Sequence, residues 1–157
     1  MPARRAPAKP SSDDLRRLLQ RFIRDFGLLA QNQTPCGKPL QTSHAHALMA
    51  LLDENRQLNQ KDLARELGLD KSSIARLCQR MEQEGHIEQL RSDGDARVRH
   101  LRLTARGAKL AREIEQSSKQ RFAAVLDAVP AAERARLFSG LELLAQAVRT
   151  VRGDGVE

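Results

Sequence analysis

Residues 63–77, LARELGLDKSSIARL, restrict the fold of this chain more than any other stretch of the sequence. Apolar residues recur at helical spacing on both sides of a Gly-Leu-Asp break, which predicts two short helices joined by a tight turn. Gly68 permits the turn and ends the first helix, and Asp70 can cap the second. Ala64 leaves room for a close helix crossing. The pattern is that of a helix-turn-helix.

Further helices are expected on both sides of this motif, because apolar residues keep a helical period from about Ser12 to Leu29, after position 42, and from Thr104 to about Val129. A last helix follows Pro130. The recognition helix of the motif should bury one stripe, made of Ile74, Leu77, Cys78 and Met81. The expected capping residues are Ser11 or Ser12, Thr42 or Ser43, Asn59, Asp70 and Thr104.

A β-hairpin is predicted after the motif, where HIEQLR and RVRHLRL flank a Ser-Asp-Gly-Asp-Ala turn. Leu101 and Leu103 alternate inward, while Val98 is out of phase with them. Residues 91–107 contain five arginines. The fold class is therefore mostly α with a small β-hairpin wing. Only 3% of the chain is aromatic, so the core must consist of Leu, Ile, Val and Ala.

Positive charge is concentrated in part of the chain. The net charge of +7 comes from +3 in residues 1–10 and +5 in residues 56–112, and the other segments are close to neutral. A basic patch on a neutral frame indicates a polyanionic partner, although a solvated surface accounts equally well for the charge alone.

The start of the second motif helix carries polar residues suited to contact DNA. In a helix-turn-helix this end enters the major groove, where hydroxyls contact phosphates or bases and arginine forks onto guanine. The hairpin would act as a wing, with Arg97 entering a narrow minor groove and Asp95 directing its guanidinium. Arg91 and Arg99 would contact phosphates or remain solvated. The candidate residues of the helix are Lys71, Ser72, Ser73 and Arg76.

The outer helices are apolar enough to need burial but lie far in sequence from the centre. The last helix has an apolar seam with alternating spacings of four and three, as in a coiled coil. We therefore expect a homodimer formed by the first and last helices, with intrachain packing as the alternative. The expected interface residues are Leu15, Phe22, Phe26, Phe122, Leu137, Phe138, Leu141, Leu144 and Val148.

Residues 70–107 resemble the MarR-type winged helix-turn-helix transcriptional regulators. They carry a capped recognition helix closed by Gly85, followed by Asp95-x-Arg97-x-x-x-Leu101-x-Leu103-Thr104-x-x-Gly107. The chain departs from the family at Gln89 and Ala96, where relatives often have basic residues. The resemblance covers residues 40–114 by motif and the flanking helices by layout.

The resemblance implies a homodimer that binds pseudo-palindromic double-stranded promoter DNA, and we expect this regulator to act as a repressor. It also implies release by a small-molecule effector bound between the dimerisation region and the winged helix. The expected organisation is a disordered basic arm at 1–10, an N-terminal dimerisation helix and loop at 11–39, the DNA-binding domain at 40–107, dimerisation helices at 108–152 and a tail at 153–157.

Cys36, His44 and His46 fall within eleven residues, which raises the hypothesis of a metal or redox sensor. The two histidines are two positions apart on a predicted helix and point to different faces, so both cannot easily bind one ion together with Cys36. We therefore predict no metal site and no cofactor. Cys78 is expected to act as a small buried hydrophobe, and His86 and His100 as ordinary residues in or beside the strands.

Two other classes of function compete with a DNA-binding regulator. The first is a winged helix that binds proteins without specific DNA binding. The second is an enzyme with Cys36 as nucleophile and His44 or His46 as base, but the sequence has no Gly-rich phosphate loop and no paired carboxylates. Two cysteines fit a reducing cytosol, and no apolar stretch has the length of a membrane span. We expect a cytoplasmic, non-enzymatic protein.

Overall fold

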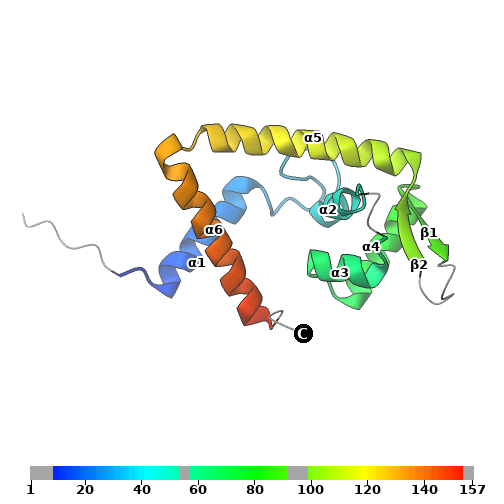
Figure 1. The fold of residues 1–157 in the computed structure, drawn as a ribbon, viewed down its shortest axis with the longest axis horizontal. Helices are drawn as coiled ribbons and strands as arrows, with labels where there is room; N and C mark the ends of the chain where they lie inside the picture. The colour runs from blue at the N-terminus through cyan, green and yellow to red at the C-terminus, as the bar shows by residue number, and fades with distance from the viewer. Residues whose placement is uncertain (1–8, 54–56, 92–98, 154–157) are drawn as a thin grey trace, which may run out of the picture. The chain divides into compact units, whose positions relative to one another are not determined.

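The computed structural model describes residues 9–53, 57–91 and 99–153 of the chain. It confirms the expected fold class, since the described part consists of helices and one two-stranded hairpin (Figure 1). Residues 1–118 and 119–157 form two compact units. The elements in chain order are α1 (Ser12–Phe26), α2 (Thr42–Ala50), α3 (Gln60–Leu67), α4 (Lys71–Gln83), β1 (Ile87–Arg91), β2 (Arg99–Leu103), α5 (Ala105–Asp127) and α6 (Ala131–Arg152).

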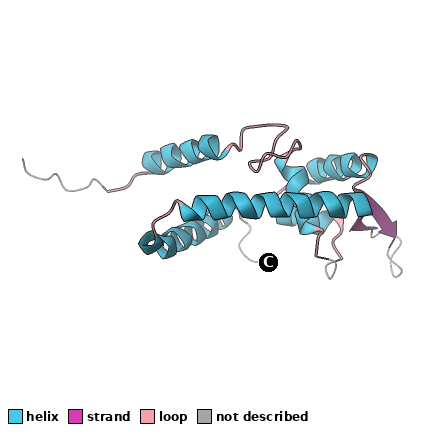
Figure 2. Ribbon diagram, turned by 90° about the horizontal axis from the view of Figure 1, so that it is seen from above, coloured by secondary structure: helices cyan, strands magenta, loops and turns pink. Residues whose placement is uncertain are grey.

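The core of the first unit lies where α2, α3 and α4 meet the hairpin and the start of α5. Each of the three helices contacts the other two, and β1 also packs against α4. Figure 2 shows the hairpin as the strand structure beside these helices. The predicted inward stripe of α4 is confirmed, because all four of its members are buried. The largest fully buried side chains are Leu48, Leu63, Met81, Ile114 and Cys78.

Local capping explains where most of these helices begin. Ser11 and Asp14 form a capping box at α1, and Asn59 and Asp62 form another at α3. These two caps and the predicted cap at Asp70 are confirmed. The predicted cap of α2 is wrong. The cap position is Gln41, which makes no side-chain bond to the helix, so Thr42 and its neighbour already lie in the first turn.

Glycines in left-handed conformation end three of the described helices, α1, α3 and α6. Gly27 follows α1 with a φ of 84°, so α1 ends at Phe26 and the predicted stripe as far as Leu29 runs beyond the helix. Gly68 follows α3 with a φ of 63° and produces the turn of the helix-turn-helix, as the sequence predicts.

The hairpin is antiparallel, and Ile87 pairs with Leu103 and Gln89 with Leu101. Leu101 is buried and Leu103 is partly buried against the core, which confirms their inward alternation. The amide of Leu101 also donates to the carbonyl oxygen of Leu58 at 2.8 Å, so the segment before α3 extends the pairing of β2. The turn at 92–98 lies outside the described residues, and so do Val98 and the predicted wing-tip pair Asp95 and Arg97.

A compact joint connects α4, the hairpin and α5. The hydroxyl of Thr104 donates to the carbonyl oxygen of Gly85 at 2.6 Å and accepts from the amide of Gly107 at 3.0 Å, which confirms Thr104 as the cap of α5. The amide of Thr104 donates to the carbonyl oxygen of His86 at 3.0 Å. Gly107 is buried here, and a Cβ on it would collide with the carbonyl of His86.

In the second unit, Arg134 closes the turn between α5 and α6. Its Nε donates to the carbonyl oxygen of Val129 at 3.2 Å, and its guanidinium lies 3.7 Å from the Asp127 carboxylate. No residue of α6 is buried within the single chain, and the same holds for α1 in the first unit. Among the described residues, none of the helices is long and apolar enough to cross a membrane.

We predict that Gly107→Ala destabilises the fold. Alanine normally stabilises a helix by about 1 kcal/mol relative to glycine, but here the added methyl group meets the backbone of His86. We expect a loss of about 1–3 kcal/mol in the free energy of unfolding, as for other overpacked sites, measured by urea denaturation. A variant as stable as the wild type would show that the backbone of Gly107 does not approach the carbonyl of His86 this closely.

Candidate nucleic-acid interface

The start of α4 presents a polar face to solvent. Lys71, Ser72 and Arg76 are exposed and Ser73 is half-buried, whereas the opposite side of the helix packs into the core. The alternation follows directly from the 3.6-residue period, because the apolar stripe fixes which side chains point outward. The structure thus brings these four predicted residues together on one accessible helix end.

Asp70 organises that end. Its carboxylate accepts the amides of Ser72 and Ser73 at 2.8 and 2.9 Å and their hydroxyls at 2.7 and 2.6 Å. Hydrogen bonds from Ser73 and Ser72 hold the pKa of Asp70 well below its usual range. Because each hydroxyl donates its proton to Asp70, the serine oxygens can act toward other partners only as acceptors. The guanidinium of Arg76 donates to Ser73 Oγ at 3.4 Å.

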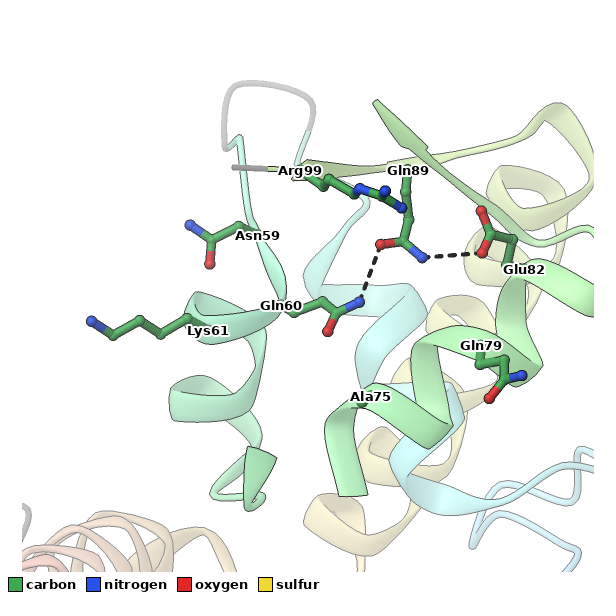
Figure 3. Close-up of a pocket in the computed structure, with 8 residues that line it drawn as sticks. All are labelled: Asn59, Gln60, Lys61, Ala75, Gln79, Glu82, Gln89 and Arg99. Atoms are coloured by element: carbon green, nitrogen blue, oxygen red, sulfur yellow. Dashed lines mark hydrogen bonds between the residues drawn. The ribbon is translucent and has the colours of Figure 1, made fainter. Parts of the chain in front are cut away.

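A hollow of about 620 Å³ lies beside this face, between the start of α3, the outer side of α4 and the hairpin (Figure 3). Ala75 and Gln79 line it, one and two turns after the start of α4, and both are exposed. The sequence interpretation missed these two residues, although helical spacing from Ser72 places them on the same face. The other lining residues are Asn59, Gln60, Lys61, Glu82, Gln89 and Arg99.

A chain of hydrogen bonds runs along the floor of the hollow. Gln60 Nε2 donates to Gln89 Oε1 at 3.1 Å, and Gln89 Nε2 donates to Glu82 Oε2 at 3.0 Å, as Figure 3 shows. These bonds join α3, β1 and α4 side by side. Gln89 is one of the departures from the family pattern. Its side chain links α3 to α4, because it bonds to Gln60 on one side and to Glu82 on the other.

The hairpin contributes one described basic side chain to the hollow. Arg99 lines it together with Gln79 of α4, so the predicted phosphate contact on β2 lies beside the recognition helix. Arg102, on the same strand, forms an ion pair with Glu88 of β1, with 2.7 Å between the guanidinium nitrogen and the carboxylate oxygen. Arg91 lies in β1, but its side chain is outside the described set, as are Asp95 and Arg97.

The histidines and cysteines separate into different environments. His44 is buried and His46 is exposed, which confirms that they occupy different faces of α2. The side chain of Cys36 pairs with Thr34, with Sγ 3.1 Å from Oγ1. Cys78 is buried, and burial raises the pKa of its thiol to about 11, so it behaves as an inert hydrophobe.

His86 was expected to be unremarkable, but it is buried against His44. The ring centroids lie 5.2 Å apart in an edge-to-face arrangement, with His86 Nδ1 3.2 Å from His44 Nε2. Burial lowers the pKa of both rings, although the carboxylate of Glu84 acts in the opposite direction. Sequence reasoning could not find this pair, since the two residues are 42 positions apart in different elements.

The outer helices carry large apolar side chains that the single chain leaves uncovered. Phe22 of α1 is 52% exposed and Leu141 of α6 is 53% exposed. Two of the predicted interface residues, Phe26 and Leu144, are half-buried, and the Phe26 ring stacks on Phe22 at a centroid distance of 5.2 Å. The other exposed members of the predicted set are Leu15, Phe122, Leu137, Phe138 and Val148.

The fold and the exposed α4 face define a winged helix-turn-helix protein. Residues 38–98 match the model of the MarR family. This part of the chain is therefore similar to the MarR family, which is also the family that the sequence motifs resemble. The match ends within the turn of the hairpin, so it covers the complete helix-turn-helix and β1.

Curated transcriptional regulators are similar to part of the chain. The HTH-type transcriptional regulator BilQ of Clostridioides difficile is 30% identical over 81 residues, covering 51% of this chain and 55% of BilQ. The HTH-type transcriptional regulator FarR of Neisseria gonorrhoeae is 31% identical over 84 residues, covering 54% of this chain and 58% of FarR. The chain thus spans about half the length of these curated relatives.

Solved structures match over most of the chain. The PcaV transcriptional regulator of Streptomyces coelicolor, in complex with its natural ligand, has a TM-score of 0.65 at 25% identity and covers 91% of this chain and 99% of PcaV. FabT of Streptococcus pneumoniae in complex with DNA has a TM-score of 0.69 at 20% identity, and the match covers 88% of this chain and 95% of FabT. The likeness to FabT shows the shared fold.

We predict that the cap at Asp70 controls the order of the α4 start. Asp70→Ala should lower the Tm by a few degrees, whereas Asp70→Asn should retain most of the cap, because asparagine also accepts from the helix amides. Thermal unfolding followed by circular dichroism at pH 7 measures both. Equal losses in the two variants would contradict a capping role.

The same carboxylate gives a pH prediction. Its folded pKa lies below the ordinary value of 3.8, so its contribution to stability is present above that pH and is lost as the pH falls toward the folded value. The Tm difference between the wild type and Asp70→Ala should therefore narrow below about pH 4. A difference that stays constant from pH 7 to pH 3 would contradict this assignment.

Proposed function

We propose that this protein is a sequence-specific DNA-binding transcriptional regulator that binds double-stranded promoter DNA through α4 and the hairpin. The observation that carries the proposal is the polar end of α4, held outward by its buried opposite face and ordered by Asp70. That helix end is the part of a helix-turn-helix that enters the major groove. The names of the curated relatives support the same function.

Each residue has a distinct role in this proposal. Arg76 would fork onto guanine, and the Ser72 and Ser73 oxygens would accept from base amino groups. Lys71 and Arg99 would contact phosphates on the two sides of the groove. On sequence grounds, Arg97 would enter the minor groove, supported by Asp95, and Arg91 would contact the backbone.

The protein would bind as a homodimer through the exposed apolar residues of α1, α5 and α6. Soluble monomers rarely leave so many large apolar side chains in solvent, and their concentration on the outer helices supports burial against a second copy. A two-fold dimer presents two recognition helices to a pseudo-palindromic site. Its action would be repression, in the cytoplasm at the nucleoid, with release by a small-molecule effector.

A protein-interaction module with the same fold is the alternative. Specific DNA binding requires a steep salt dependence, since each phosphate contact contributes about −0.9 to the slope of log K against log salt. It also requires preference for one duplex over random sequence. A protein-interaction module would show neither the preference nor a loss of binding when the polar face of α4 is changed.

We predict that Arg76→Ala weakens binding to the selected duplex by about 1–3 kcal/mol, the range for one base contact, with little effect on random DNA. Fluorescence anisotropy at fixed salt measures both. Arg112→Ala removes the same charge from an exposed position on α5 and serves as the matched control. Equal effects of the two substitutions would reject base contact by Arg76.

We predict that Leu141→Glu converts the dimer into a monomer, because burying an ionised carboxylate at the interface costs on the order of several kcal/mol. Leu143→Glu is the matched control, since Leu143 is exposed on the same helix but lies outside the predicted seam. Sedimentation velocity distinguishes the two states. A dimeric Leu141→Glu protein, or a monomeric Leu143→Glu protein, would place the interface elsewhere.

A further inference from the structure

Three side chains with metal-ligand chemistry converge at the junction of α2, α4 and β1. His44 lies in α2, Glu84 directly follows α4, and His86 directly precedes β1. One ligand atom from each lies within 4.8 Å of the other two. This cluster is separate from the polar face of α4 and from Cys36, and none of the functions proposed above uses it.

The distances within the cluster match those of a small coordination sphere. His86 Nδ1 lies 3.2 Å from His44 Nε2 and 3.3 Å from Glu84 Oε2, and His44 Nδ1 lies 3.8 Å from the same carboxylate oxygen. Zinc bonds to nitrogen and oxygen are about 2.0–2.2 Å long, so tetrahedral ligands stand roughly 3.3–3.6 Å apart. His44 would bind through one of its two ring nitrogens, and one ligand atom from each of the three residues already lies within 4.8 Å of the other two.

The surroundings favour an open site. The two imidazoles are buried, whereas the Glu84 side chain is 45% exposed, so one side of the cluster reaches solvent. Water can supply a fourth ligand there. Arg80 and Arg106 oppose a cation electrostatically, because both act to lower the pKa of the neighbouring histidines. The affinity should accordingly be moderate.

We propose that His44, Glu84 and His86 form a binding site for a divalent transition-metal ion, with zinc as the preferred occupant. Two imidazoles and one carboxylate are a ligand set that zinc commonly takes with a water in the fourth position. The bound ion would join α2, the end of α4 and the beginning of β1. The proposal stands independently of DNA binding and can be tested without any duplex.

The test is a zinc titration of the full-length protein without an affinity tag, in competition with a chromogenic chelator at pH 7.5. The wild type should bind one zinc ion per chain and should gain thermal stability when zinc is added. Glu84→Gln and His44→Gln should each weaken binding at least about tenfold, a loss typical of even an outer-shell partner. Glu84 is the cleaner position because its side chain is half-exposed and its removal leaves the core intact.

Two variants serve as matched controls. His46→Gln removes an exposed histidine from the same helix, and Cys36→Ser removes the half-buried thiol that precedes His44 in the sequence. Both should bind zinc as the wild type does. Cobalt in place of zinc should give the visible absorption of a tetrahedral nitrogen and oxygen site, and Glu84→Gln should alter that spectrum. The proposal is overturned if the wild type does not compete with the chelator, if Glu84→Gln retains full affinity, or if a control loses as much as Glu84→Gln.

Discussion

The contact between Thr104 and the end of α4 is the constraint on which the functional surface depends. Thr104 joins the carbonyls of Gly85 and His86 to the first turn of α5, and Gly107 allows the backbones to approach because it has no Cβ. A hairpin of two short strands is only marginally stable alone. This joint, together with the pairing of Leu101 to Leu58, fixes the hairpin against the helices.

The recognition surface follows from that fixed geometry. Because the apolar stripe of α4 is buried in the core, the polar side of the helix must face solvent. Asp70 accepts hydrogen bonds from the two serines at the start of the helix and so orders them. The bonds from Gln60 through Gln89 to Glu82 then hold α3, β1 and α4 at a set spacing. Arg99 consequently lies over the same hollow as Gln79. A rigid surface of this kind suits binding to a stiff partner such as duplex DNA, because little ordering entropy is lost on association.

Periodicity and capping chemistry predicted the helices, the hairpin and the buried stripe, because those features depend on residues close in sequence. The cap of α2 was missed, since Gln41 precedes that helix without a side-chain bond and Thr42 resembles a better cap. The pair of His44 and His86 was beyond sequence reasoning, because only the packing of α2 against the start of β1 brings the rings together. The place of Gln79 on the polar face of α4 could have been predicted from its helical spacing to Ser72. The wing-tip assignments at Asp95 and Arg97 stay predictions.

The most direct test of the account is selection of bound duplexes from a random-sequence library with the purified full-length protein, followed by sequencing. A winged-helix dimer should enrich an inverted repeat whose half-sites are centred about one helical turn, roughly 10 base pairs, apart or a multiple of that spacing. Recovery of such a repeat would establish sequence-specific binding with two-fold symmetry. Enrichment of no sequence, or of a single motif without an inverted partner, would contradict the proposed recognition by a symmetric pair of α4 helices.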